Sequence, residues 1–178
     1  AAADNGGATV VTVPANFATE AEAGDSRVAR KVRRRTNDRI TGSVIGTYDA
    51  VVFTSPTAPL DIMRNEELIL IAAEAKANDN KLAEALTDIN VIRTQSGGLP
   101  ARGAFVSLED ATNEILRQRR YSLFYEGHYF VDLRRTGRLR PVVSTSPQQT
   151  LAFSSAPYTL FNRMEKPAAE KAWDRTNP

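Results

Sequence analysis

The stretch DIMRNEELILIAAEAKANDNKLAEALTDINVIRTQSGG, residues 61–98, decides the fold class. Apolar residues recur in it at three- and four-residue spacing, which is the period of an amphipathic helix. The spacing predicts one helix from residue 61 to the turn at residues 78–80, and a second at residues 81–95 that two glycines stop. The stretch therefore predicts an αα-hairpin about as long as one tetratricopeptide repeat, which makes a tetratricopeptide-like scaffold one interpretation.

Two further helices are expected after the hairpin. Ser107 as N-cap, with Asp110 three residues later, opens a helix that we expect to reach residue 126, where Gly127 ends or kinks it. A short helical piece follows at residues 128–135, and Pro167 in a first turn favours a last helix at residues 167–173. The predicted fold is mainly α.

The flanking segments are poor in helix signals. Glycines and prolines punctuate residues 1–60, where two β-branched runs, at 9–13 and 51–54, predict short strands among loops. With 178 residues, we expect one domain in three parts. These are an irregular segment with short strands at 1–60, a helical core at 61–140, and an irregular tail with a short terminal helix at 141–178.

Composition excludes several classes of protein. No apolar run approaches the roughly 18 residues that a membrane-spanning helix needs. The absence of cysteine excludes disulfides, thiolate zinc sites and a thiol nucleophile, and a single histidine, His128, excludes a multi-histidine metal site. No pattern calls for a cofactor, so we expect neither a metal nor a cofactor.

The stretch QRRYSLFYEGHYFVDLRRTG, residues 118–137, places two carboxylates among paired arginines. One hypothesis makes Glu126 and Asp132 the acid pair of a glycan hydrolase. On a continuous helix, however, six residues turn the two side chains about 120° apart, and nearby arginines lower a carboxyl pKa instead of raising it. We therefore expect no catalytic residue, and expect both acids to be counter-charges that fix the end of the third helix to the segment after Gly127.

The run at residues 27–39 holds seven basic side chains and one acid, Asp38. Such a run could bind a nucleic-acid backbone, but it contains no aromatic residue for base stacking. A basic nucleic-acid-binding module is thus the second alternative, and a solvated or ion-paired surface segment is the favoured interpretation.

Read together, the helical segments resemble the carboxy-terminal part of SusD/RagB-like proteins, outer-membrane nutrient-binding lipoproteins of Bacteroidetes-type bacteria. Three family motifs occur in the family's order. They are carried by Arg64, Glu67, Leu70, Ala73, Glu74 and Ala75, then by Ala85, Ile89, Asn90 and Arg93, then by Arg119, Arg120, Leu123, Tyr125, Glu126, Gly127, Asp132, Leu133 and Arg135.

Some positions add to this resemblance or depart from it. Asp25-Ser26-Arg27 is similar to a short family element upstream of the hairpin, which would make the basic run an irregular loop. Gln118 and Ser122 stand where the family usually has glutamate, and Tyr129 stands where it has arginine. The two lost acids put the usual ion pairing of the arginines in doubt.

The resemblance implies a SusD-like helical fold and a non-catalytic protein at the cell surface. Such a protein captures glycans or other nutrient oligomers for a TonB-dependent outer-membrane transporter of the SusC type, and nucleic acid is not an expected partner. It would be held at the outer membrane only through a lipid anchor that this chain lacks. The chain would match about the last third of a typical member, with the ligand site mainly in the rest. The structural motif would comprise Arg119, Arg120, Glu126, Gly127, Asp132 and Arg135.

Overall fold

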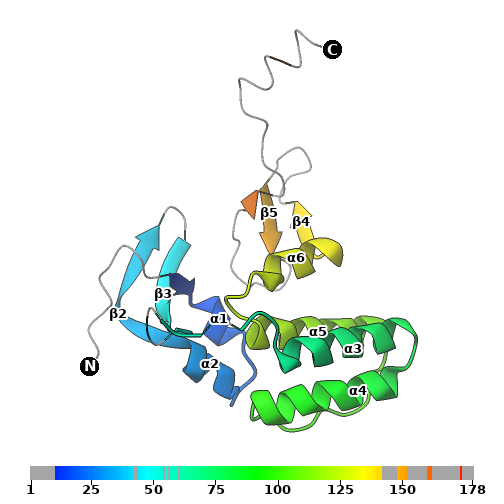
Figure 1. The fold of residues 1–178 in the computed structure, drawn as a ribbon. Helices are drawn as coiled ribbons and strands as arrows, with labels where there is room; N and C mark the ends of the chain where they lie inside the picture. The colour runs from blue at the N-terminus through cyan, green and yellow to red at the C-terminus, as the bar shows by residue number, and fades with distance from the viewer. Residues whose placement is uncertain are drawn as a thin grey trace. The chain divides into compact units, whose positions relative to one another are not determined.

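The computed structural model describes residues 11–41, 44–53, 55, 57–59, 61–141, 148–151, 160–161 and 173 (Figure 1). The chain divides into two compact units, Ala1–Asp132 and Leu133–Pro178, and each is described by itself. The grouping into one domain with segments 1–60, 61–140 and 141–178 stays a prediction.

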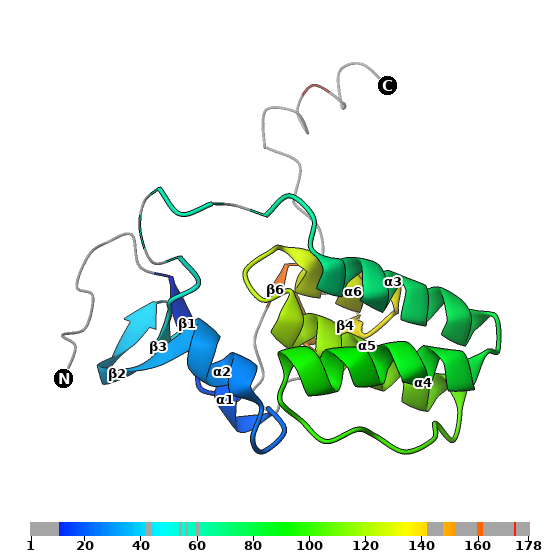
Figure 2. The ribbon, with the colours of Figure 1, turned by 60° about the horizontal axis from the view of Figure 1, so that its bottom comes forward.

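The helical hairpin is confirmed. Helix α3 spans Asn65–Asn78, helix α4 spans Leu82–Val91, and one π-helical turn, Ile92–Ser96, extends α4 (Figure 2). Asn80 makes the connection with a left-handed backbone, φ 59°, a conformation that asparagine tolerates better than most residues. The hairpin thus starts and ends within a few residues of the boundaries that the apolar spacing predicts.

Helix α5, Leu108–Ser122, packs against both helices of the hairpin. Small Ala73 and Ala85 are fully buried in this core, which lets large side chains close around them. The buried apolar residues of the core are Leu70, Ala73, Ala77, Ala85, Ile89, Ile92, Phe105, Ala111, Ile115 and Leu123.

The start of α5 is as predicted, and its end is not. Ser107 caps the helix by accepting a hydrogen bond from the Asp110 backbone N–H at 3.1 Å. The helix stops at Ser122, four residues before the expected residue 126, because the next turn contains left-handed residues at Tyr125, φ 77°, and Gly127, φ 80°. Helix α6, His128–Arg135, then begins where the sequence predicts.

The segment before the hairpin forms a small sheet. Its elements are β1 (Thr12–Pro14), α1 (Asn16–Thr19), α2 (Ser26–Lys31), β2 (Val32–Thr41) and β3 (Val44–Ala50), and the antiparallel strand order is β1-β3-β2. Gly46 lets β1 and β3 come together, because a Cβ at this position would lie 2.3 Å from the Cβ of Thr12. A second apolar cluster, Val13, Phe17, Val32 and Tyr121, joins this sheet to α5.

Two predictions for this segment are wrong. The run at 51–54 is not a strand where it is described, since β3 ends at Ala50. The basic run at 27–39, expected as an irregular loop, is the end of α2 followed by most of β2. β2 pairs with β3, which begins at Val44, so the pairing is local in sequence. The strand was not expected because consecutive arginines at 33–35 interrupt the β-branched and aromatic pattern by which a strand is recognised. The run at 9–13 is a strand from Thr12 onward among the described residues.

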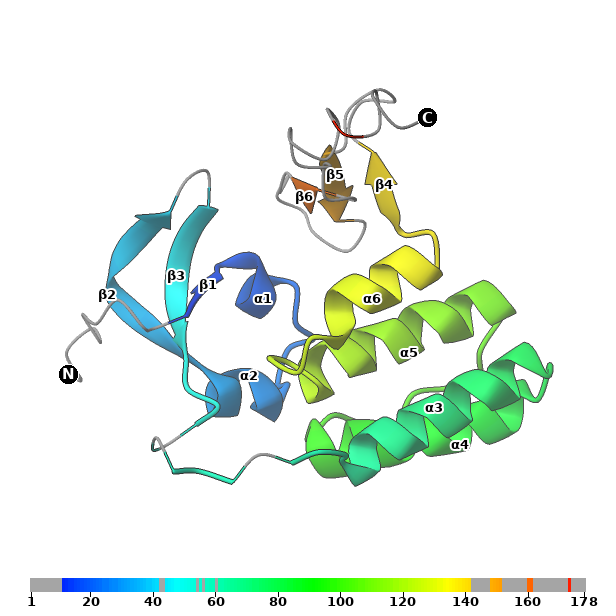
Figure 3. The same cartoon turned by 45° about the horizontal axis from the view of Figure 1, so that its top comes forward.

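The second unit contains the antiparallel sheet β4-β5-β6, formed by Leu139–Pro141, Gln148–Leu151 and Leu160–Phe161 (Figure 3). The tail predicted to be irregular thus has short strands where it is described. The terminal helix predicted at 167–173 lies outside the described residues except for Trp173, which is helical and exposed. The fold is mainly α, as predicted. Within the described part of the chain, no helix has the length and apolar content needed to cross a membrane.

Candidate functional site

Helix α5 carries a row of buried polar side chains. Glu114, Gln118 and Ser122 recur every four residues, so they lie on one face of the helix, and Arg119 lies beside them. At most 6% of each of these residues is exposed. Buried polar groups are costly unless they are hydrogen-bonded, so their partners show what this face does.

Glu114 and Glu22 hold Arg93 from two sides. Arg93 donates to Glu114 Oε1 at 2.6 Å and to the two carboxylate oxygens of Glu22 at 2.7 and 2.8 Å. The hydrogen bonds that Arg93 donates to Glu22 raise the pKa of Arg93 and lower the pKa of Glu22. Gln118 donates its amide to the same Glu114 oxygen at 2.8 Å. A neutral amide here avoids a second carboxylate beside Glu114.

Asp25 and Arg27 form a second buried pair. The guanidinium donates to both carboxylate oxygens of Asp25, at 2.9 and 2.7 Å, and to the hydroxyl of Ser122 at 3.0 Å. Asp25 also caps α2 by accepting from the Arg27 backbone N–H. Arg27 is 1% exposed, so this short element links the N-terminal segment to the end of α5.

Four charged residues of the predicted motif, Arg119, Arg120, Glu126 and Asp132, are ion-paired, but not all of them with partners in their own stretch. Arg119 donates to Asp132 at 2.7 Å, and their side chains are 7% and 4% exposed, so this pair joins α5 to α6 as expected. Arg120 binds Glu20 at 2.7 Å. Arg135 is exposed at the end of α6.

Glu126 departs from the expected pairing. It accepts from Arg64 at 3.0 Å, and about a quarter of each side chain is exposed. Because Arg64 is the N-cap residue of α3, Glu126 fixes the turn that follows α5 to the start of the hairpin, and not to the segment after Gly127. Gly127 supplies the left-handed turn between Glu126 and α6.

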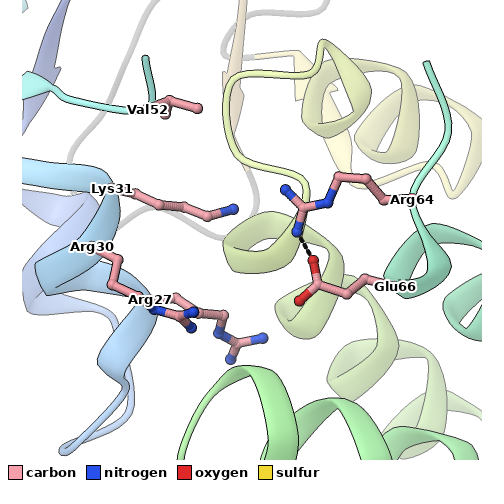
Figure 4. A pocket seen from close by; sticks show the side chains of 6 residues that line it. All are labelled: Arg27, Arg30, Lys31, Val52, Arg64 and Glu66. Atoms are coloured by element: carbon pink, nitrogen blue, oxygen red, sulfur yellow. Dashed lines mark ion pairs between the residues drawn. The ribbon is translucent and has the colours of Figure 1, made fainter. Parts of the chain in front are cut away.

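A cationic cavity lies where α2 faces the start of α3. It has a volume of about 220 Å³ and is lined by Arg27, Arg30, Lys31, Val52, Arg64 and Glu66. Figure 4 shows the side chains of Lys31 and Arg64 extending toward each other from the two sides, with Glu66 paired to Arg64. Burial, together with the neighbouring cations Arg64, Arg27 and Arg30, lowers the pKa of Lys31 to about 8. The cavity therefore concentrates positive charge at the edge of low-dielectric protein.

The structure does not favour the hydrolase hypothesis. A general acid or nucleophile must reach the substrate, yet Asp132 is buried and bonded to Arg119, and Glu126 is bonded to Arg64. The described residues contain no cluster of acidic or histidine side chains able to hold a metal ion.

The ion pairs of the basic run weaken the nucleic-acid hypothesis. Three arginines of the basic run are paired with carboxylates: Arg27 with Asp25, Arg34 with Asp38, and Arg35 with Asp49. These pairs fit the favoured interpretation of an ion-paired segment, although it is a helix and a strand and not a loop.

Sequence reasoning did not identify Glu22, Glu114 or the cavity around Lys31. Glu22 and Arg93 lie 71 residues apart, so no local spacing reveals their contact. The sequence did indicate a polar row on the buried face of α5, because Glu114, Gln118 and Ser122 interrupt an apolar pattern at helical spacing.

The comparison with known families matches this chain to the SusD family over residues 47–175. No curated protein and no solved structure matches it. The matched range contains all three sequence motifs, whereas the Asp25-Ser26-Arg27 element lies before it. Because this match covers well over half of the chain and agrees with the mainly α fold, the chain belongs to the SusD family.

Proposed function

We propose that the protein is a non-catalytic, SusD-like binding protein at the cell surface. It captures glycans or other nutrient oligomers and delivers them to a SusC-type TonB-dependent transporter. The observation that carries this proposal is the family match over residues 47–175, since proteins of this family generally bind nutrients. A lipid anchor holds the whole protein at the outer membrane, and the αα-hairpin serves as a tetratricopeptide-like scaffold.

The contacts of the acidic residues support the non-catalytic part of the proposal. Asp132, Glu114 and Asp25 are each engaged by arginine and are at most 8% exposed. Buried carboxylates with such partners hold helices together and are not free to act on a substrate. The proposed motif of Arg119, Arg120, Glu126, Gly127, Asp132 and Arg135 is accordingly structural.

Co-purification tests the transporter partnership. The tagged protein is isolated in mild detergent from the outer membranes of its own source, and the proteins that accompany it are identified by mass spectrometry. We expect a TonB-dependent transporter in near-equal amount. Recovery of the protein without any transporter, under conditions in which the outer membrane is fully solubilised, would contradict the proposal.

A further inference from the structure

The cationic cavity between α2 and the start of α3 has more positive charge than its own carboxylate can neutralise. Four cations and one carboxylate, Glu66, line it. Among the described residues, Arg27 and Arg64 have carboxylate partners, whereas Arg30 and Lys31 have none. Arg30 donates to the backbone carbonyls of Ser26 and Ser96, and Lys31 to that of Ser122. Carbonyl groups satisfy hydrogen bonds but carry no net charge to neutralise these cations.

Two exposed aromatic rings adjoin the residues of this cavity in sequence. Phe53 follows Val52, which lines the cavity, and Tyr125 precedes Glu126, the partner of Arg64. The rings meet edge to face with centroids 5.9 Å apart, and they are 44% and 45% exposed. Tyr125 has a left-handed backbone, φ 77°, a sparsely populated conformation that is concentrated at binding sites.

From these contacts we infer that the cavity binds the carboxylate or sulfate group of an acidic oligosaccharide. Lys31 and Arg30 recognise the anion, and Phe53 and Tyr125 flank the sugar. Guanidinium and ammonium groups form charge-assisted hydrogen bonds with such anions. The cavity, at about 220 Å³, is smaller than the pockets that enclose drug-sized ligands, so it suits one acidic substituent and not a whole oligomer. The inference rests on the proposed function for the saccharide part of the ligand.

Calorimetric titration with trigalacturonate, with the matching neutral galactose trisaccharide and with inorganic sulfate tests this inference. We expect trigalacturonate to bind more tightly than either of the other probes. Lys31→Met and Arg30→Gln should each weaken its binding about ten- to a hundredfold, the usual effect of losing a hydrogen bond from a charged group. Arg33→Gln is the matched control, because Arg33 is an exposed arginine of β2 outside the cavity.

Proton uptake gives an independent readout. The groups that act on Lys31 are Arg27, Arg30, Arg64 and Glu126, and its pKa is about 8. A bound anion favours the charged form, so binding at pH 8 should take up as much as about half a proton, and binding at pH 6.5 almost none. Titrations in two buffers of different ionisation enthalpy measure this uptake, which Lys31→Met should abolish.

Several results would overturn the inference. These are equal affinity for acidic and neutral trisaccharides, sulfate binding as tight as trigalacturonate binding, or folded Lys31→Met and Arg30→Gln variants that bind like Arg33→Gln. Binding of neither trisaccharide also overturns it. None of these results decides the proposed function, which the co-purification with a transporter tests separately.

Discussion

Replacing Asp25 by asparagine isolates the contribution of one buried ion pair. Asparagine keeps the shape of the side chain and remains a good N-cap for α2, so the substitution removes the charge and little else. The guanidinium of Arg27, 1% exposed, then loses its counter-ion in the interior. Breaking a buried pair in this way costs about 3–5 kcal/mol, because it leaves an uncompensated buried charge.

The chain offers a matched control for this substitution. Asp38 pairs with Arg34 at 2.7 Å, the same distance as between Asp25 and Arg27, but these side chains are 43% and 53% exposed. An exposed pair contributes about 0–1 kcal/mol. Urea unfolding, with a slope of about 2 kcal/mol per molar, should therefore show the midpoint falling by about 1.5–2.5 M for Asp25→Asn and by less than about 0.5 M for Asp38→Asn. Equal shifts would refute the reasoning that burial decides the value of these pairs.

Three other predictions concern stability and use matched variants. Gly127→Ala should destabilise the protein by about 1–2 kcal/mol, because the φ of Gly127 is +80° and, with no atom near the added Cβ, backbone strain is the only cost. Gly103→Ala should be neutral or stabilising. Thermal melts of both variants check this. Tyr121→Phe should lower the free energy of unfolding in urea by about 1 kcal/mol, because it removes a buried hydrogen bond to a backbone carbonyl. Tyr129→Phe should leave it unchanged, since the buried Tyr129 hydroxyl has no partner among the described residues. Equal losses of stability in the two variants would contradict this prediction. The pKa of Lys31 in the folded protein is lowered to about 8, so between pH 8 and the ordinary lysine pKa the unfolded chain binds more protons than the folded one. The free energy of unfolding of the wild type, relative to that of Lys31→Met, should therefore rise from pH 8 to pH 10. A difference in urea midpoints that does not change with pH would show that Lys31 has the same pKa in both states.

Helical elements could be predicted because their signals are local. The three- and four-residue spacing of Leu70, Ala73 and Ala77 and the Ser107 cap act within one or two turns, and both are found as expected. The early end of α5 was not predicted, because Tyr125 adopts a left-handed backbone conformation that is uncommon for tyrosine.

The ion-pair network could be predicted only in part. Asp132 was expected to be a counter-charge within its own stretch, and its partner Arg119 lies 13 residues away in that stretch. Arg27 and Ser122 are 95 residues apart, and Arg64 and Glu126 are 62 apart, so only the tertiary fold reveals these contacts. Gln118 and Ser122 stand where the resemblance leads one to expect glutamate, and each bonds to a charged partner, Glu114 and Arg27 respectively.

The central claim, capture of a nutrient oligomer without chemistry, is tested most directly by the fate of a bound oligosaccharide. End-labelled neutral and acidic oligosaccharides are incubated with the protein, bound and free label are separated by equilibrium dialysis, and the recovered sugar is sized by chromatography. The account predicts saturable binding of at least one oligosaccharide that is recovered at its original length. Shortened chains, formed in proportion to protein and incubation time, would contradict it.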